Sequence, residues 1–158
     1  MSKITLLTVG KTDVRWVREG LELYMERVSH YVPFAVDEIP ELKNVSALSR
    51  DQIKEKEGEI LLKKIRDKDC VMLLDERGTE YGSTDFAAFV QEKIARGNRD
   101  IVFVIGGAYG FSQALYSRAD HLISLSKMTF SHQMVRTIFL EQLYRAFTII
   151  RGEPYHHR

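Results

Sequence analysis

Cysteine, proline and long apolar runs are all scarce in this chain. The single cysteine, Cys70, lies in the apolar run CVMLL, so no intrachain disulfide can form, and we expect a buried structural thiol in a reducing compartment. No apolar stretch approaches the length of a membrane span. The opening MSKITLLTVGK has too short an apolar run for a signal peptide. We therefore expect a soluble cytoplasmic protein without membrane association.

Several ligand-binding motifs are missing as well. The chain has no CxxC or HExxH spacing, and the adjacent His156 and His157 are poorly placed to share one ion, so no metal site is expected. The first turn, VGKTDV, has one glycine, which argues against a nucleotide-dependent oxidoreductase with GxGxxG. No GK[ST] follows the later glycine loop, so a phosphate-binding P-loop is also excluded.

Charge is nearly balanced overall but not along the chain. The formal net charge is +1, yet residues 127–158 hold five Lys/Arg against two Glu, whereas the other 126 residues hold 18 basic and 20 acidic groups. Three of the five histidines also lie in this C-terminal stretch. A basic end fits a phosphate-rich partner. A solvated helix face followed by a charged tail explains it equally well.

Hydrophobic periodicity predicts one domain in which strands and helices alternate, with no linker to divide the 158 residues. The expected strands are 4–9, 34–39, 70–74, 101–105 and 121–125. The expected helices are 13–29, 49–66, 83–94, a short one after Ser112, and 133–150. Ser49 with Gln52 has capping-box spacing, and Ser83 is a candidate cap. The order predicts an α/β fold with a mostly parallel five- or six-stranded sheet and helices on both faces.

The last expected helix, 133–150, is apolar on more than one stripe. Such a helix must be buried on several sides. We expect one side to pack on the sheet and another on a second copy of the chain. A helix fully enclosed by its own domain is the alternative.

Three loops follow expected strands, and ligands of open α/β sheets bind outside the carboxyl ends of strands. These loops are DERGTEYG, GGAYGFS and SKMTFSH. Gly106, Gly107 and Gly110 would let backbone approach a ligand closely. A tight turn without a ligand explains the glycines equally well.

The loop SKMTFSHQMVR and the tail RGEPYHHR concentrate groups that can bind or react. Ser126 and Thr129 could hold a polar ligand between Met128 and Phe130, although Ser131 and Phe130 could simply cap and staple the last helix. In the tail, Tyr155, His156 and His157 can stack, form hydrogen bonds and supply a base that titrates near neutral pH.

Four segments, IGGAYG, LSKMTFSHQMVR, EQLYRAF and RGEPYHHR, occur in the order of a known family. The chain resembles the RlmH group of bacterial rRNA methyltransferases, which belongs to the SPOUT class of α/β-knot enzymes. The likeness runs from ITLLTVGK to the last residues, and residues 41–68 contribute least to it.

The resemblance implies a C-terminal trefoil knot, which general topology rules would never suggest. It also implies S-adenosylmethionine as cofactor, bound bent between the knot loops. The implied cofactor contacts are Leu74, Gly106, Leu125, Ser126, Lys127, Met128, Thr129 and Phe130.

The implied reaction is transfer of a methyl group to N3 of a pseudouridine in 23S rRNA of the assembled ribosome. The implied assembly is a homodimer in which the partner's tail completes each site. Within this reaction we predict His156 as the general base, Tyr155 as a stacking or positioning group, and Arg145 as a partner for phosphate or developing negative charge. Arg158 and Lys127 are weaker phosphate candidates.

Two other classes of protein remain as alternatives. A non-catalytic ribosome- or RNA-binding α/β module would lack selective affinity for S-adenosylmethionine, and the intact glycine loop, SKMTF loop and YHH tail argue against it. A purely structural dimer leaves those ordered loops unexplained.

Overall fold

The computed structural model describes residues 2–157, and a sheet in which every strand pairing is parallel forms its centre. The order across the sheet is β2-β1-β4-β3-β5. The predicted parallel sheet is confirmed, with five strands among the described residues. The strands are β1 (Ile4–Val9), β2 (Phe34–Ile39), β3 (Cys70–Glu80), β4 (Ile101–Ile105) and β5 (His121–Ser124).

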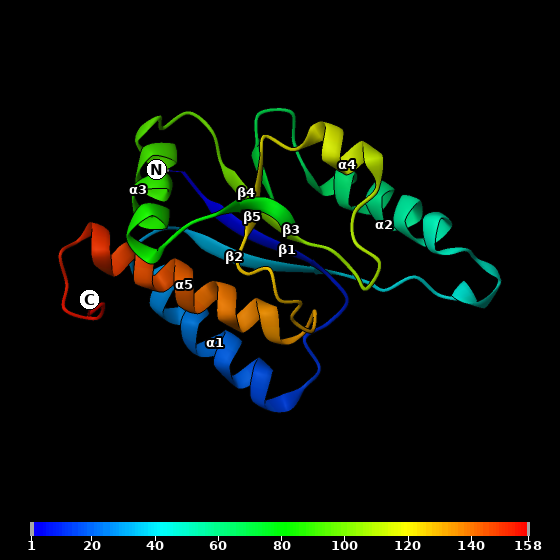
Figure 1. The fold of residues 1–158 in the computed structure, drawn as a ribbon, viewed down its shortest axis with the longest axis horizontal. Helices are drawn as coiled ribbons and strands as arrows, with labels where there is room; N and C mark the ends of the chain where they lie inside the picture. Colours follow the sequence, from blue (N-terminus) through cyan, green and yellow to red (C-terminus); the bar gives the residue numbers. More distant parts are fainter. Residues whose placement is uncertain (1, 158) are drawn as a thin grey trace.

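Helices cover both faces of the sheet, as predicted (Figure 1). Helices α1, α3 and α5 pack on one face, and α2 and α4 pack on the other. A short 3-10 turn, η1 (Val45–Ala47), precedes α2. The helices are α1 (Arg15–Ser29), α2 (Arg50–Lys64), α3 (Ser83–Ala95), α4 (Gln113–Arg118) and α5 (Met134–Ile150).

Strand β4 shows how the sequence builds two hydrophobic cores. Ile101, Phe103 and Ile105 join the core beneath α1, α3 and α5, while Val102 and Val104 join the core beneath α2 and α4. Successive side chains of a strand point to opposite faces, so a strand covered on both faces is apolar at every position. This is why its five residues form an unbroken β-branched and aromatic run.

Of the two helix caps that the sequence predicted, at Ser49 and Ser83, the first is confirmed. Ser49 and Gln52 form a reciprocal capping box at the start of α2, and the Ser112 hydroxyl accepts from the Leu115 N–H at the start of α4. The prediction for Ser83 is wrong, because Gly82 is the N-cap of α3. The Ser83 hydroxyl instead donates to the side-chain oxygen of Gln142 on α5, 3.0 Å away.

Strand β3 continues past its predicted end at Leu74 to Glu80, through residues that we expected to form a loop. Leu74 and Thr79 both pair with Ile123 of β5, so the second half of β3 returns alongside the same neighbour. A Cβ added to Gly78 would lie 2.5 Å from the Ile123 nitrogen. The two backbones therefore touch where the chain crosses β5. The second half of β3 is thus a strand because it pairs with β5, and its sequence has no apolar pattern that would predict one.

Helix α5 packs between α1 and α3 over the sheet, which accounts for its wide apolar surface. Phe139, Leu140 and Leu143 are completely buried. Met134, at its first turn, keeps 41% of its surface exposed. No helix within residues 2–157 is both long enough and apolar enough to cross a membrane.

Candidate active site

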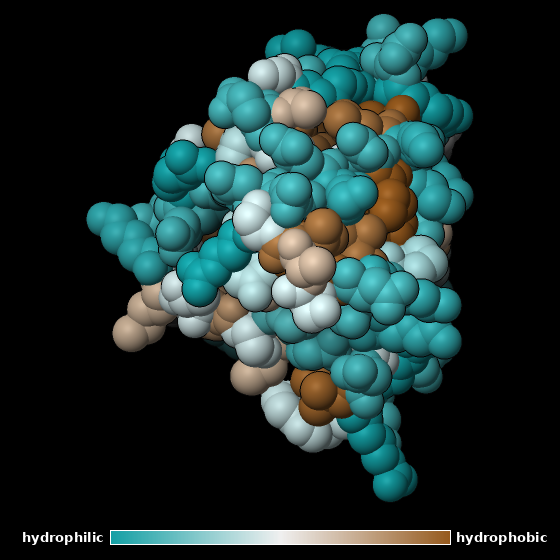
Figure 2. Space-filling view, turned by 90° about the vertical axis from the view of Figure 1, so that its right-hand side faces the viewer, coloured by the Kyte–Doolittle hydropathy of each residue, from teal (hydrophilic) through white to brown (hydrophobic). Residues whose placement is uncertain are grey.

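A cavity of about 650 Å³ lies at the carboxyl ends of β4 and β5 and beside the middle of β3, where the register of β3 shifts. The strands point toward the right of Figure 1, and Figure 2 views that side of the molecule, where hydrophobic patches lie among hydrophilic side chains. The walls come from the three loops that the sequence singled out, together with Lys54 of α2 and Tyr116 of α4. The loops after three neighbouring strands thus converge on one site, as expected of an open α/β sheet.

The glycine loop after β4 lines the cavity with three glycines and with Ala108, Tyr109 and Phe111. A Cβ on Gly106 would lie 3.0 Å from the Phe111 ring, and one on Gly107 would lie 2.7 Å from a carboxylate oxygen of Glu57. Gly110 has a φ of +87°, a conformation that favours glycine. A larger residue at position 106 or 107 would therefore have to displace its neighbours.

The loop after β5 forms the opposite wall. The Ser126 hydroxyl accepts from the Met128 N–H at 2.9 Å, and the Ser124 hydroxyl donates to the Ser126 carbonyl at 3.0 Å. These bonds hold the loop in a tight turn that leaves Met128 79% and Phe130 37% exposed. Two large apolar side chains at a cavity wall gain hydrophobic stabilisation when a ligand covers them.

Seven of the eight predicted cofactor residues line this cavity. The exception is Lys127, whose side chain is 87% exposed and whose ammonium lies 4.0 Å from the Glu80 carboxylate. The seven lining residues are Leu74, Gly106, Leu125, Ser126, Met128, Thr129 and Phe130.

The cavity also contains a polar group that the sequence did not single out. The Tyr116 hydroxyl donates to the Asp75 carboxylate, and the Arg77 guanidinium lies 4.6 Å from the centre of the Tyr116 ring. Burial, and then the hydrogen bond to Asp75, raise the pKa of Tyr116. Tyr116 therefore stays a neutral donor at physiological pH. It lies on α4 rather than at a strand end, so no sequence signal indicated it.

The predicted catalytic residues form a second cluster near the C-terminus. Arg145 contacts Nδ1 of His156 at 3.0 Å, and its guanidinium lies 4.8 Å from the centre of the Tyr155 ring. Glu141, which we did not predict, joins them: it accepts from Arg145 at 2.9 Å and from the Tyr155 hydroxyl at 2.8 Å. Glu141 and Arg145 are four residues apart on one helix, and this spacing could have predicted their ion pair from the sequence.

This geometry assigns hydrogen-bonding roles within the cluster. A guanidinium can only donate, so Nδ1 of His156 accepts from Arg145, and the proton of a neutral ring lies on Nε2. Burial, followed by hydrogen bonding with Tyr24 and Glu141, raises the pKa of Tyr155 well above its ordinary value. Tyr155 is therefore a protonated donor, and the Nδ1 lone pair of His156 is occupied.

The C-terminal cluster and the cavity lie at opposite edges of the sheet. Val135 lines the cavity at the start of α5, and Arg145 lies ten residues, or about 15 Å, further along the helix. Figure 1 shows the C-terminal end of α5 on the side away from the carboxyl ends of the strands. None of Arg145, Tyr155 and His156 lines the cavity of their own chain. Arg158 lies outside the described residues.

Known proteins provide an independent comparison. The chain is 51% identical over 155 residues to ribosomal RNA large subunit methyltransferase H of Parabacteroides distasonis, covering 98% of this chain and 99% of that protein. It is 53% identical to the protein of the same name from Porphyromonas gingivalis, with the same coverage.

Among solved structures, a methylase family protein from Neisseria gonorrhoeae superposes with a TM-score of 0.56 at 12% identity, covering 99% of this chain and 86% of that one. One from Haemophilus influenzae gives 0.52 at 13% identity, with 99% and 70% covered. These two likenesses support the fold. The family model for SPOUT methyltransferases matches residues 2–156. The chain therefore belongs to the SPOUT methyltransferase family, which implies the C-terminal knot and the use of S-adenosylmethionine.

Proposed function

We propose that this protein transfers a methyl group from S-adenosylmethionine to N3 of a pseudouridine in 23S rRNA of the assembled ribosome. The observation that carries the proposal is the cavity beside the middle of β3 and the carboxyl ends of β4 and β5, with the glycine loop on one wall and the exposed Met128 and Phe130 on the other. Relatives about half identical over 98% of the chain are named for methylation of the large ribosomal subunit's RNA.

The cavity fits the cofactor in size and chemistry. Its volume of about 650 Å³ lies within the range of small-molecule sites. Leu74, Leu125, Met128 and Phe130 suit a flat purine ring, and the Asp75 carboxylate suits a cationic centre. When bound, the cofactor supplies an electrophilic methyl group. The residues that we propose to hold it are Leu74, Gly106, Leu125, Ser126, Lys127, Met128, Thr129 and Phe130.

We also propose a homodimer with two composite sites. A chain whose cavity and C-terminal cluster lie at opposite edges cannot bring them together by itself. A two-fold related copy, packed in the inverted orientation across α1 and α5, brings its tail to this cavity. Trp16 and Leu23 of α1 and Met134 of α5 are 62%, 45% and 41% exposed, and such apolar side chains suit an interface.

In this composite site, a residue of the C-terminal cluster accepts the proton that leaves N3 of the pseudouridine. A neutral histidine ring can accept a weakly acidic proton. His156 remains our candidate base, but its Nδ1 accepts from Arg145. We propose that Arg145 turns to an RNA phosphate or to the developing charge on the base, which frees Nδ1. Tyr155, held by Glu141, then positions or stacks on the nucleobase.

The experiment is methyl transfer from radiolabelled S-adenosylmethionine to ribosomes from cells that lack this enzyme, followed by mass spectrometry of the rRNA. A methyl group on N3 of a large-subunit pseudouridine is the expected result. The rate should fall steeply with added salt because phosphate contacts release counterions. Cofactor binding without transfer to these ribosomes would refute the proposed substrate, and absence of both would refute the proposed enzyme.

A further inference from the structure

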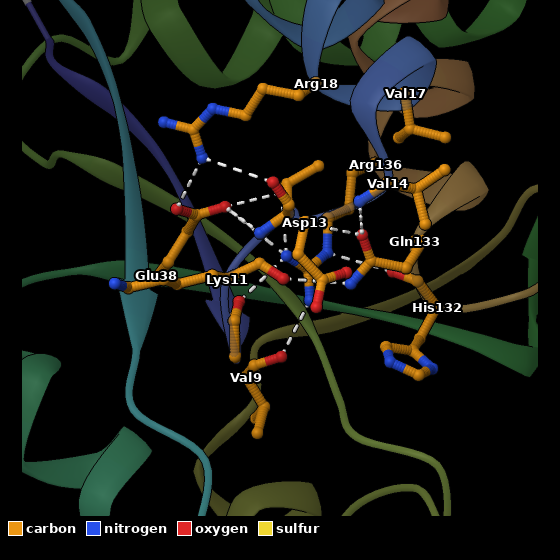
Figure 3. A network of polar contacts seen from close by, with 12 residues as sticks. Val9, Lys11, Asp13, Val14, Val17, Arg18, Glu38, His132, Gln133 and Arg136 are labelled. Atoms are coloured by element: carbon orange, nitrogen blue, oxygen red, sulfur yellow. Dashed lines mark hydrogen bonds and ion pairs between the residues drawn. The ribbon is translucent and has the colours of Figure 1, made fainter.

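Arg136, in the first turn of α5, is completely buried. Figure 3 shows its guanidinium among the ends of several segments. It donates to the Val9 carbonyl at 2.7 Å, the Gly10 carbonyl at 2.8 Å and the His132 carbonyl at 2.9 Å. One side chain thus joins the carboxyl end of β1 to the last residues of the loop that walls the cavity.

Thr12 and Glu38 complete the environment of this buried cation. Arg136 donates to the Thr12 hydroxyl at 2.8 Å, and that hydroxyl donates in turn to Glu38. Burial alone would raise the pKa of Glu38, but hydrogen bonds from Thr12 and from the Arg18 guanidinium outweigh it and lower the pKa. Glu38 therefore carries a negative charge that partly compensates the buried Arg136.

Gln133 forms a second connection between the same two segments. Its side-chain nitrogen donates to the Lys11 carbonyl at 2.9 Å, and its side-chain oxygen accepts from the Asp13 N–H at 3.0 Å. The loop 10–14, which does not line the cavity, is thereby attached to the start of α5.

We propose that Arg136, through Thr12 and Glu38, is a positioning residue for the cofactor wall formed by residues 125–132. Neither Arg136 nor Thr12 lines the cavity, whereas Ser131, His132 and Val135 do. These hydrogen bonds fix the position of residues 125–132 relative to β1, an interior strand of the sheet. The inference rests on the proposed cofactor site and adds residues to it that no loop motif indicated.

The experiment compares Thr12→Val with Thr12→Ser, because valine keeps the shape and removes the hydroxyl that joins Arg136 to Glu38. Arg136→Lys is the second variant, since a lysine cannot reach all three carbonyls. Arg118→Lys is the control: Arg118 also donates to three carbonyls, those of Arg66, Asp67 and Asp69, but at the amino edge of the sheet. Titration calorimetry with S-adenosylhomocysteine gives Kd, and amide hydrogen exchange of the free protein reports on residues 125–132. Both are measured below the melting temperature of every variant.

For Thr12→Val and Arg136→Lys we expect Kd to rise about tenfold, equivalent to about 1.4 kcal/mol, with faster exchange in residues 125–132. Thr12→Ser and Arg118→Lys should keep the original Kd. If Thr12→Val and Arg136→Lys lower the melting temperature but leave Kd and exchange unchanged, Arg136 is only structural and the inference is wrong. If the unchanged protein itself does not bind the ligand, the proposed cofactor site fails instead.

Discussion

At the residue scale, Glu141 orders the C-terminal cluster. It accepts from both Arg145 and Tyr155, so it fixes two of the three groups that we propose to meet the nucleotide. Glu141→Gln removes the charge and weakens the hold on Arg145. We expect kcat/KM for methyl transfer to fall about tenfold or more, because small misplacements of reacting groups are costly. The control is Glu92→Gln, since Glu92 also pairs with an arginine four residues later, the exposed Arg96 at the C-terminal end of α3. Equal rates for the two variants would contradict this role.

His121 provides a pH prediction at the same scale. Burial, and then the charge of Lys93, lower its pKa below the ordinary value near 6.5. The unfolded chain therefore binds this proton more readily, and the free energy of unfolding should decrease as pH falls below about 7. His121→Gln removes this contribution. Denaturant unfolding at a series of pH values measures this. As pH falls, the free energy of unfolding should decrease less for the variant than for the original protein, and an equal decrease in both proteins would contradict the assignment.

Individual residues also show why part of the site was predictable and part was not. Leu74 ends a predicted strand, Gly106 directly follows β4, and Met128 lies in the loop after β5, so topology brings them to one edge. Tyr116 and Glu141 act through partners that are distant in sequence or on a neighbouring helical turn. Their roles depend on packing, which a linear pattern does not encode.

At the element scale, β3 and β5 hold the least predictable part of the fold. An unbroken apolar run specified β4. The second half of β3 is polar and largely exposed, so only its pairing with Ile123 and Ser124 of β5 makes it a strand. The knot was likewise inferred from family resemblance and from no periodicity, because topology rules disfavour knots. By contrast, the capping box of Ser49 and Gln52 follows from local chemistry and was predicted.

Gly78→Ala tests this crossing of β3 and β5. The added Cβ would lie 2.5 Å from backbone atoms of Leu122 and Ile123, which cannot move without breaking the pairing. We expect the free energy of unfolding to decrease by about 2–3 kcal/mol, measured by denaturant unfolding. Gly82→Ser is the control, since no atom lies within 4 Å of a Cβ there and serine is a favourable N-cap. A Gly78→Ala protein as stable as the original would show that the crossing tolerates a wider separation.

At the scale of the whole molecule, the separation of the cavity from the C-terminal cluster determines what one chain can do. Helix α5 carries Val135 at one edge of the sheet and Arg145 near the other, and a straight helix cannot bring them together. A monomer would therefore keep cofactor binding and lose the proposed proton transfer. Two inactive variants, one changed in the cavity and the other in the tail, should then regain methyl-transfer activity when they form mixed dimers.

Subunit complementation tests this directly. One chain carries Gly106→Val, whose side chain would meet Phe111 and spoil the cavity, and the other lacks residues 154–158. Each should be inactive alone. In mixed dimers, the intact tail of the first chain completes the intact cavity of the second. Random exchange of equal amounts makes half the dimers mixed, each with one working site, so about a quarter of the original activity should return. Methyl transfer by the co-refolded mixture measures this. Full activity of the truncated chain alone, or no recovery although mixed dimers are seen by native mass spectrometry, would mean that the tail does not act across the interface.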